Sequence, residues 1–206
     1  MSDERILFLA RHGETDWNAE GRWQGQTDVP LNANGQAQSY ALAERMRPER
    51  IASIAASDLA RARMTAEIVA GVLGIREVST DSDLREQRFG SFEGLTRKES
   101  EARFPEAWAH YAADWRTTPP GGEPYEALLT RVRTAAQRLA NELATPALVV
   151  MHGGAIRALL GDHVSVIPSP ASTGWARHGI PNGGIFRLTV SAGRIVEALR
   201  FEVAAP

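Results

Sequence analysis

An arginine and a histidine stand side by side directly after a short apolar segment. Residues 6–10 are continuously apolar and are followed by Arg11, His12 and Gly13. A short apolar run bounded by polar residues is typical of a strand buried on both faces of a parallel sheet. Ligands of open α/β sheets bind at the carboxyl ends of the strands, so Arg11 and His12 are candidates for chemistry.

The chemistry that this pair suits is attack of an imidazole on a phosphorus atom. The planar guanidinium of Arg11 matches phosphate oxygens. Its charge disfavours a second positive charge nearby, which helps to keep His12 neutral and nucleophilic. Gly13 lets a substrate approach the backbone closely. For an isolated Arg-His pair an ordinary polar loop is the better interpretation, so other segments must decide.

A second histidine repeats the pattern of the first. His152 follows the apolar residues 147–151 and precedes Gly153 and Gly154, which open a predicted helix. The N-terminal amides of a helix favour an anion. Alone, His-Gly-Gly would indicate only a turn after a strand, but two histidines at two parallel strand ends can converge.

An arginine and a carboxyl group complete the candidate set. Arg61 falls in the first turn of a predicted helix that follows a strand, so it can point toward the same sheet edge. Arg63 is better explained as a solvated helix residue. Glu86 is the right type of group to donate a proton to a leaving oxygen, although a lone glutamate is far more often a surface charge.

The elements that must position these groups alternate between strand and helix along the chain. This alternation predicts an α/β fold, a three-layer α/β/α sandwich with a mostly parallel central sheet and an antiparallel edge strand near the C-terminus. Residues 13–34 are predicted to form a long polar loop. The predicted strands are residues 6–10, 51–56, 147–151, 185–190 and 195–203, and the predicted helices are residues 35–46, 59–73, 128–143 and a segment opening at 153–154.

One segment breaks the alternation. Within residues 85–122 aromatic side chains are scattered among charges, which predicts a helical lid insertion at about residues 87–122. With Arg88, the lid would select the leaving group, although most of its aromatic residues are expected to pack its own small core. The aromatic residues concerned are Phe89, Phe92, Phe104, Trp108, Tyr111 and Trp115.

Composition limits the classes of function. The 206 residues are 43% hydrophobic, which suits a single domain over residues 1–206. The net charge is −2 and arginines alternate with acids, so neither nucleic acid nor a membrane is an expected partner. The chain has no cysteine, which excludes disulfides and thiol nucleophiles. The start of the sequence does not resemble a secretory signal, so a cytoplasmic location is expected.

Other catalytic patterns fit less well. Residues 81–83 superficially match an aspartyl phosphatase motif, but a solvated turn explains them better. Residues 90–94 place serine one position too early for a nucleophile elbow. The only lysine, Lys98, does not follow a glycine-rich loop, so no Walker A motif exists. No metal is expected because three further histidines lack the spacing of a zinc site: His110, His163 and His178.

Taken in order, these motifs resemble the histidine phosphatase superfamily, the phosphoglycerate mutase-like proteins. The resemblance extends from residue 6 to about residue 190, nearly the whole chain. The matching segments are residues 9–18 with 22–31, 57–66, 84–86 with Gly90 and 93–94, 152–154, and the late asparagine loop at 181–184.

The resemblance implies a role for each candidate residue. His12 would be the nucleophile that becomes phosphohistidine, while Arg11, Arg61 and His152 would bind the phosphoryl group. Glu86 would protonate the leaving alcohol and then take a proton from the attacking water. No metal or other cofactor is expected. The substrate-binding residues would be Asn18, Gln24, Thr27 and Gly153.

Within the family, the chain length favours the compact phosphatase branch. This branch predicts a metal-independent phosphomonoester hydrolase of histidine acid phosphatase type, with a small phosphorylated metabolite as partner. A cofactor-dependent phosphoglycerate mutase is the nearer alternative, and a catalytically silent phosphate-binding or regulatory module is the more distant one. Residues 121–125 depart from the Gly-Glu-Ser of many relatives, which leaves the subgroup open. A homodimer is also left open.

Overall fold

A six-stranded sheet lies at the centre of the computed structural model, which describes residues 4–161, 180–192 and 194–200. Its strand order is β3-β2-β4-β1-β5-β6. The strands are β1 (Glu4–Arg11), β2 (Ser53–Ser57), β3 (Val78–Asp81), β4 (Ala147–Met151), β5 (Ile185–Ser191) and β6 (Arg194–Arg200). The ladders β1/β4, β2/β4 and β2/β3 are parallel, whereas β1/β5 and β5/β6 are antiparallel. The mostly parallel sheet with antiparallel pairing at its C-terminal edge is confirmed.

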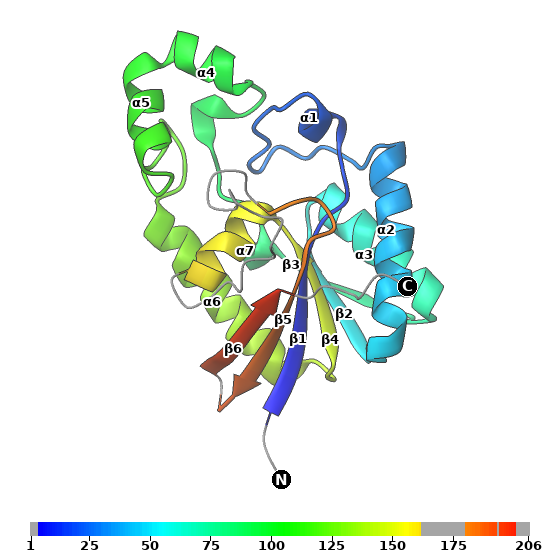
Figure 1. The fold of residues 1–206 in the computed structure, drawn as a ribbon. Helices are drawn as coiled ribbons and strands as arrows, with labels where there is room; N and C mark the ends of the chain where they lie inside the picture. The colour runs from blue at the N-terminus through cyan, green and yellow to red at the C-terminus, as the bar shows by residue number, and fades with distance from the viewer. Residues whose placement is uncertain (1–3, 162–179, 193, 201–206) are drawn as a thin grey trace.

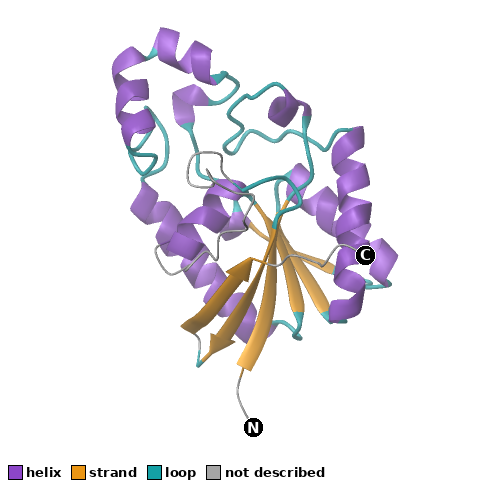
Figure 2. Ribbon diagram, in the orientation of Figure 1, coloured by secondary structure: helices purple, strands orange, loops and turns teal. Residues whose placement is uncertain are grey.

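Helices cover both faces of this sheet (Figures 1 and 2). The α-helices are α1 (Asp16–Ala19), α2 (Ala33–Met46), α3 (Ala60–Leu73), α4 (Arg97–Arg103), α5 (Pro105–Ala113), α6 (Tyr125–Glu142) and α7 (Gly153–Leu160), and the 3₁₀ helices are η1 (Arg47–Glu49), η2 (Ser82–Leu84) and η3 (Gly90–Phe92). Helices α2 and α3 cover one face of the sheet, and α6 and α7 cover the other. The predicted three-layer α/β/α sandwich is therefore confirmed.

Strand β1 has no solvent-facing side, as its continuous apolar sequence predicts. Leu7 and Leu9 belong to the hydrophobic cluster under α6 and α7, while Phe8 and Ala10 belong to the cluster under α2 and α3. All five residues of β4 are buried as well. Because side chains alternate between the two faces of a strand, a strand between two helical layers must be apolar throughout.

Two elements differ from the sequence prediction. The predicted loop at 13–34 contains the four-residue helix α1, whose start is capped by Thr15 and Asn18. Strand β3 was not predicted, because Val78–Asp81 contains only one apolar residue. It pairs with β2 alone and lies at the edge of the sheet, where water can solvate its polar side chains. The aspartates predicted to form a turn at 81–83 lie at its end and in η2.

The lid consists of η3, α4 and α5, above the carboxyl ends of the parallel strands (Figure 1). Its aromatic residues do pack a small core of their own, as predicted. Phe89, Phe92 and Tyr111 are buried there, and partly buried Trp23, Phe104, Trp108 and Trp115 surround them. Trp23 comes from the segment after α1, so the lid core is completed by the N-terminal part of the chain.

Some predictions fall outside the described residues: those for His163 and His178, and the last three residues of the strand predicted at 195–203. Within residues 4–161, 180–192 and 194–200, no helix has the length and apolarity that crossing a bilayer requires.

Candidate active site

The predicted catalytic residues lie at or beyond the carboxyl ends of neighbouring parallel strands, and Arg11 is the last residue of β1. His12 comes directly after β1, and His152 comes directly after β4. Arg61 is in the first turn of α3, which follows β2, and Glu86 follows η2. Since β1, β2 and β4 are parallel neighbours, their carboxyl ends lie together beneath the lid and α1 (Figure 1). The two imidazole rings are 5.2 Å apart between centroids.

His12 is oriented by its own loop. Its backbone N–H donates to the carbonyl of Met151 at 3.0 Å, which ties the end of β1 to the end of β4. Its Nδ1 lies 2.6 Å from the carbonyl oxygen of Gly13. A carbonyl only accepts, so Nδ1 carries the proton in this hydrogen bond. The lone pair of the neutral ring is therefore on Nε2, which is the nucleophilic nitrogen.

Both imidazoles are held in the neutral form. Burial lowers the pKa of His12 well below its usual 6.5, and the charges of Arg11 and Arg61 lower it further. Burial likewise lowers the pKa of His152, and the charges of Arg61 and Arg11 lower it further. A neutral imidazole is the form that attacks an electrophile, so the surroundings of His12 favour nucleophilic chemistry.

Arg61 is buried to 1% exposure and reaches back to the N-terminal loop. Its terminal nitrogens donate to the carbonyl oxygens of Thr27 at 2.9 Å and Gly25 at 2.7 Å. Burial lowers the pKa of Arg61 to about 10, which still leaves it charged at neutral pH. Arg11 donates to the carbonyl of Ile180. Burial lowers the pKa of Arg11, and the charge of Glu86 opposes that shift.

Glu86 is 9% exposed and its carboxyl group is fixed by two backbone amides. Oε1 accepts from Gln87 N at 2.9 Å, and Oε2 accepts from Gly154 N, at the start of α7, at 2.9 Å. A Cβ on Gly154 would lie 2.4 Å from Glu86 Oε1. The glycine is therefore required for the close contact between α7 and this carboxyl group.

The predicted substrate-binding residues differ in what their side chains do. Asn18 Oδ1 accepts from Thr15 N at 3.2 Å and from Asn182 at 3.3 Å, so its oxygen is engaged and its NH₂ is the group that can donate to a ligand. The Thr27 hydroxyl donates to Glu93 Oε2 at 2.6 Å. Thr27 thus shapes the loop through Glu93 and through its carbonyl bond to Arg61. Gly153 places its backbone against the side chain of Arg11.

Several buried polar atoms of this region have no hydrogen-bond partner among the described residues. Those in or beside the site are Nε of Arg11, Nε of Arg61, both ring nitrogens of His152 and Oε1 of Gln24. A buried donor without a partner costs about 1–3 kcal/mol. The site therefore concentrates unpaired N–H groups and positive charge, which is the environment that a tetrahedral oxyanion would satisfy.

Glu93 is an important residue for which the sequence predicts no role. Besides Thr27, its carboxylate accepts from the backbone N–H groups of Gln26, Thr27 and Phe89 at 3.2, 3.1 and 2.9 Å. Gly25 has φ 53° and approaches so closely that a Cβ would lie 2.1 Å from Glu93 Oε1. Glu93 thus connects the lid to the loop that carries Thr27. Phe89 is close in sequence, but Gln26 and Thr27 are more than sixty residues away, so no local pattern could reveal this link between the lid and the loop.

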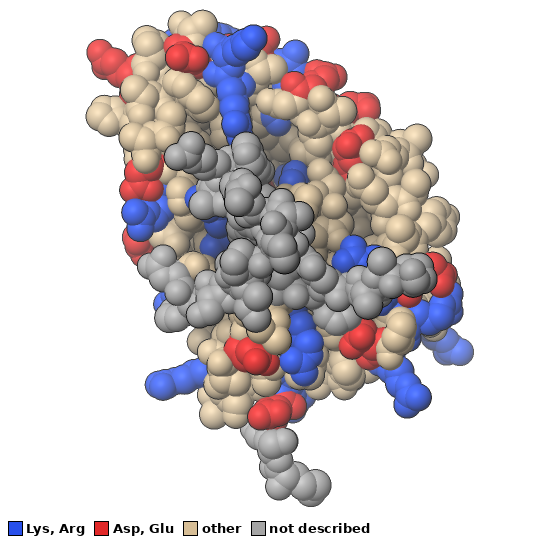
Figure 3. All heavy atoms as spheres, in the orientation of Figure 1, with Lys and Arg blue, Asp and Glu red and all other residues tan. Residues whose placement is uncertain are grey.

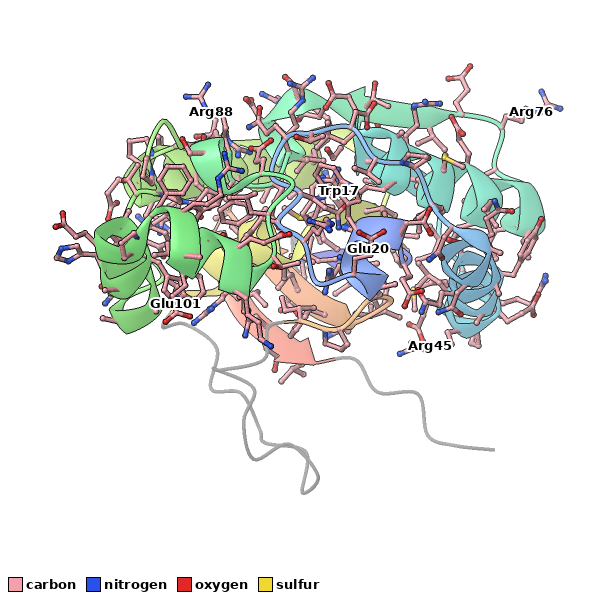
Figure 4. The ribbon with its side chains drawn as sticks, turned by 90° about the horizontal axis from the view of Figure 1, so that it is seen from above. Trp17, Glu20, Arg45, Arg76, Arg88 and Glu101 are labelled. Carbon is pink, nitrogen blue, oxygen red and sulfur yellow. The ribbon has the colours of Figure 1, made fainter. Side chains whose placement is uncertain are left out.

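The surface around the site carries charges of both signs. Figure 3 shows a hollow on this face with Lys or Arg atoms at its floor and acidic and basic side chains interspersed around it. Seen from above, α1 with Trp17 and Glu20 lies between the lid, with Arg88 and Glu101, and the α2 side (Figure 4). In the described part of the chain, no three His, Cys, Asp or Glu side chains are grouped to hold a metal ion.

Known proteins share this sequence and fold. Phosphoglycerate mutase-like protein 4 of Arabidopsis thaliana is 42% identical over 162 residues, which cover 76% of this chain and 70% of the relative. The metal-independent phosphoserine phosphatase of the same plant is 39% identical over 162 residues, covering 77% of this chain and 68% of the relative.

A solved structure has a similar fold over most of its length. The mycobacterial glucosyl-3-phosphoglycerate phosphatase, solved with VO₃, matches with a TM-score of 0.75 and 32% identity, over 89% of this chain and 92% of that one. A family model described as the histidine phosphatase superfamily, branch 1, matches residues 7–201. The chain belongs to branch 1 of the histidine phosphatase superfamily.

Proposed function

We propose that this protein is a metal-independent phosphomonoester hydrolase of histidine acid phosphatase type, which acts on a small phosphorylated metabolite. The observation that carries the proposal is the arrangement around His12. A neutral, oriented imidazole lies beside a second neutral imidazole, within the influence of the charges of Arg11 and Arg61 and near unpaired N–H donors. The relatives named phosphatases, which act on phosphoserine and glucosyl-3-phosphoglycerate, support the substrate class.

The proposed reaction has two displacements at phosphorus. In the first, the Nε2 lone pair of His12 forms a bond to phosphorus, the bond from phosphorus to the alcohol oxygen breaks, and Glu86 gives its proton to that oxygen. In the second, Glu86 takes a proton from a water whose oxygen attacks phosphorus, and the bond to His12 breaks. Two moderate barriers replace one high barrier.

The cations of the site would stabilise the transferring group. Phosphoryl transfer depends mainly on positioning and on stabilising charge spread over the equatorial oxygens. Arg11 and Arg61 provide guanidinium groups for this purpose, and His152 provides a ring N–H. These side chains would supply the positive charge that a metal ion supplies in other phosphoryl-transfer enzymes.

The lowered pKa of His12 supports activity under acidic conditions. A histidine with its usual pKa of 6.5 loses its neutral form about tenfold per pH unit below that value. Because burial lowers the pKa of His12, the neutral nucleophile persists at lower pH. This is the observation that favours the acid phosphatase type.

The first prediction concerns the nucleophile. Hydrolysis of p-nitrophenyl phosphate in EDTA should proceed in the wild type, and His12→Ala should reduce kcat by about 10³-fold or more because no phosphoenzyme can form. Acid quenching with labelled substrate should destroy the label, whereas alkaline quenching should preserve phosphohistidine on the chain. His110→Ala, in the exposed part of α5, is the matched control and should retain activity.

Three results would contradict the proposal. Substantial turnover by His12→Ala would exclude His12 as the nucleophile, and loss of wild-type activity in EDTA would exclude a metal-independent reaction. If kcat/KM fell tenfold for each pH unit below 6.5, His12 would titrate with its usual pKa, and the acid phosphatase type would be excluded.

A phosphoglycerate mutase is the second candidate, favoured by the relative that is named mutase-like. It would interconvert 2- and 3-phosphoglycerate after priming by the bisphosphate, whereas a phosphatase releases inorganic phosphate. Measuring both products from the same incubation distinguishes the two activities.

A further inference from the structure

A partly buried ion pair outside the phosphate site contacts the backbone on both sides of Glu86. Arg131 lies on α6, and Glu123 lies two residues before that helix begins. Nε of Arg131 donates to Glu123 Oε1 at 2.7 Å, and one terminal nitrogen donates to Glu123 Oε2 at 2.8 Å. The two side chains are only 17% and 14% exposed. Such a two-bond fork has a fixed geometry, unlike a mobile surface pair.

The remaining N–H groups of Arg131 bind the chain that leads into Glu86. One terminal nitrogen donates to the carbonyl oxygens of Asp83 at 2.8 Å and Arg85 at 2.6 Å. The other donates to the carbonyl of Glu86 itself at 2.9 Å. With the two bonds to Glu123, all five N–H groups of the guanidinium are used.

Glu123 binds the chain on the other side of Glu86. Its backbone N–H donates to the carbonyl of Arg88 at 2.8 Å, and its carbonyl accepts from the Gln87 side chain at 2.9 Å. The Arg131 side chain therefore holds the carbonyl groups of residues 83, 85 and 86, and the backbone of Glu123 holds residues 87 and 88. The carboxyl group of Glu86 is fixed separately by the amides of Gln87 and Gly154.

We propose that Arg131 and Glu123 are positioning residues for the proton donor Glu86. The inference rests on the proposed function, because it assigns the pair to the acid role of Glu86. The pair orients the backbone of Glu86, and the two amides then direct its carboxyl group toward the leaving oxygen. A lysine at 131 cannot replace the arginine, because three donors on one nitrogen cannot span three carbonyls and a carboxylate.

Leaving-group dependence tests this inference specifically. A series of aryl phosphates can be used whose leaving groups range from the acidic p-nitrophenol to the less acidic unsubstituted phenol. The less acidic the phenol, the more its departure depends on a proton donor. We expect Glu86→Gln to lose about 10²-fold or more in kcat/KM for the poorest leaving group and little for the best. Arg131→Lys and Glu123→Gln should show the same trend, with kcat/KM about tenfold lower for the aryl phosphate that has the poorest leaving group. Glu123→Gln keeps the side-chain size, so it tests the pair if Arg131→Lys folds poorly.

Arg138→Gln is the matched control. Arg138 lies on the same helix and pairs with Asp81 and Asp83 in the same segment, but it makes no described contact with Arg85 or Glu86. Its leaving-group dependence should equal that of the wild type. Thermal melting checks that each variant is folded.

The outcomes separate the inference from the function on which it rests. If Glu86→Gln shows the steep dependence but Arg131→Lys and Glu123→Gln lose activity equally for all leaving groups, the positioning role is wrong and the acid role stands. If Glu86→Gln itself shows no steeper dependence than the wild type, the acid role in the proposed mechanism is wrong.

Discussion

His12 and His152 owe their neutral form to burial first and to neighbouring charge second. Their pKa values lie well below 6.5, although both rings would be protonated in water under acidic conditions. Two arginines remain charged in the same space because their ordinary pKa is far higher. The site thus combines fixed cations with uncharged bases, which suits an anionic substrate attacked by a neutral nitrogen.

These shifts predict how stability depends on pH. The unfolded chain binds a proton at each histidine near pH 6.5, while the buried rings stay neutral, so stability is fully present above 6.5 and is lost as pH falls below it. Below pH 6.5, His12 and His152 should each lower the free energy of unfolding by about 1.4 kcal/mol per pH unit, until the ring in the folded protein titrates. Urea unfolding between pH 7.5 and 5.5 measures the slope.

A variant isolates the buried ring. His152→Asn should reduce the slope of the unfolding free energy against pH by the contribution of one proton. His110→Gln, in the exposed part of α5, should leave this slope unchanged. An unchanged slope in His152→Asn would mean that His152 is protonated in the native state.

Residue types alone identified the groups that could react with phosphate, but not the groups that position them. Arginine, histidine and glutamate after strands are visible in the sequence at 11, 12, 61, 86 and 152. Glu93 and Arg131 act through backbone atoms distant in sequence, which no spacing reveals. One clue existed for Arg131: it lies three residues after Leu128 and four before Ala135, on the apolar stripe that α6 buries.

At the scale of elements, the starts of helices α3 and α7 meet the ends of strands β2 and β4. The start of α7 contributes Gly154 N to Glu86, and the first turn of α3 contributes Arg61. Helix N-termini carry partial positive charge, so both elements favour an anion between them. The site depends on how closely α7 approaches the segment that carries Glu86.

Gly154→Ala tests this approach. The added Cβ would lie 2.4 Å from Glu86 Oε1, so the carboxyl group must move. We expect kcat/KM to fall by about 10- to 100-fold, since a displacement of 1 Å at a reacting group has effects of that size. Alanine suits a helix better than glycine, which offsets part of the stability lost when the carboxyl group leaves its two amides.

Gly71→Ala is the matched control for this change. Gly71 lies on α3 and a Cβ there meets nothing within 4 Å. The substitution should stabilise the protein by about 0.5–1 kcal/mol and leave activity unchanged. Equal activity in Gly154→Ala and the wild type would show that the contact is not needed for catalysis.

Elements with a buried face could be predicted from periodicity, and elements without one could not. The helix predicted at 59–73 is α3 (Ala60–Leu73), and the strand predicted at 147–151 is β4. Strand β3 and helix α1 bury almost no apolar surface of their own. Their conformation comes from pairing with β2 and from capping by Thr15, which a hydrophobic pattern does not report.

At the scale of the molecule, the apolar core of the described residues is divided into three clusters. Two lie on opposite faces of the sheet, and the third lies inside the lid with Trp23. The lid keeps a buried cluster of its own and is joined to the rest through Glu93, the Trp23 segment and Trp115, which contacts Tyr125 of α6 and Arg157 of α7. We therefore expect the lid to open without unfolding the sheet.

A pair of identical substitutions tests this separation. Phe92 in the lid cluster and Phe8 in β1 are both fully buried. Phe→Ala in a core typically costs about 3–5 kcal/mol. Phe92→Ala should accelerate amide exchange only in the lid and lower activity, whereas Phe8→Ala should lower the protection of the whole sheet. Hydrogen exchange measured by mass spectrometry distinguishes the two, and uniform loss of protection in Phe92→Ala would show one cooperative unit.

The position of β1 in the sheet has a consequence for biosynthesis. Its neighbours are β4 and β5, and Asn182 donates to the carbonyl of His12 across 170 positions of sequence. While the ribosome adds the residues between β1 and β4, the apolar segment at 6–10 has neither partner strand, and β5 follows later still. Nascent chains with such long-range strand pairings expose hydrophobic surface and unpaired strand edges during synthesis. The apolar strand that leads into His12 therefore stays unpaired for longer during synthesis than the strands that complete the sheet around it.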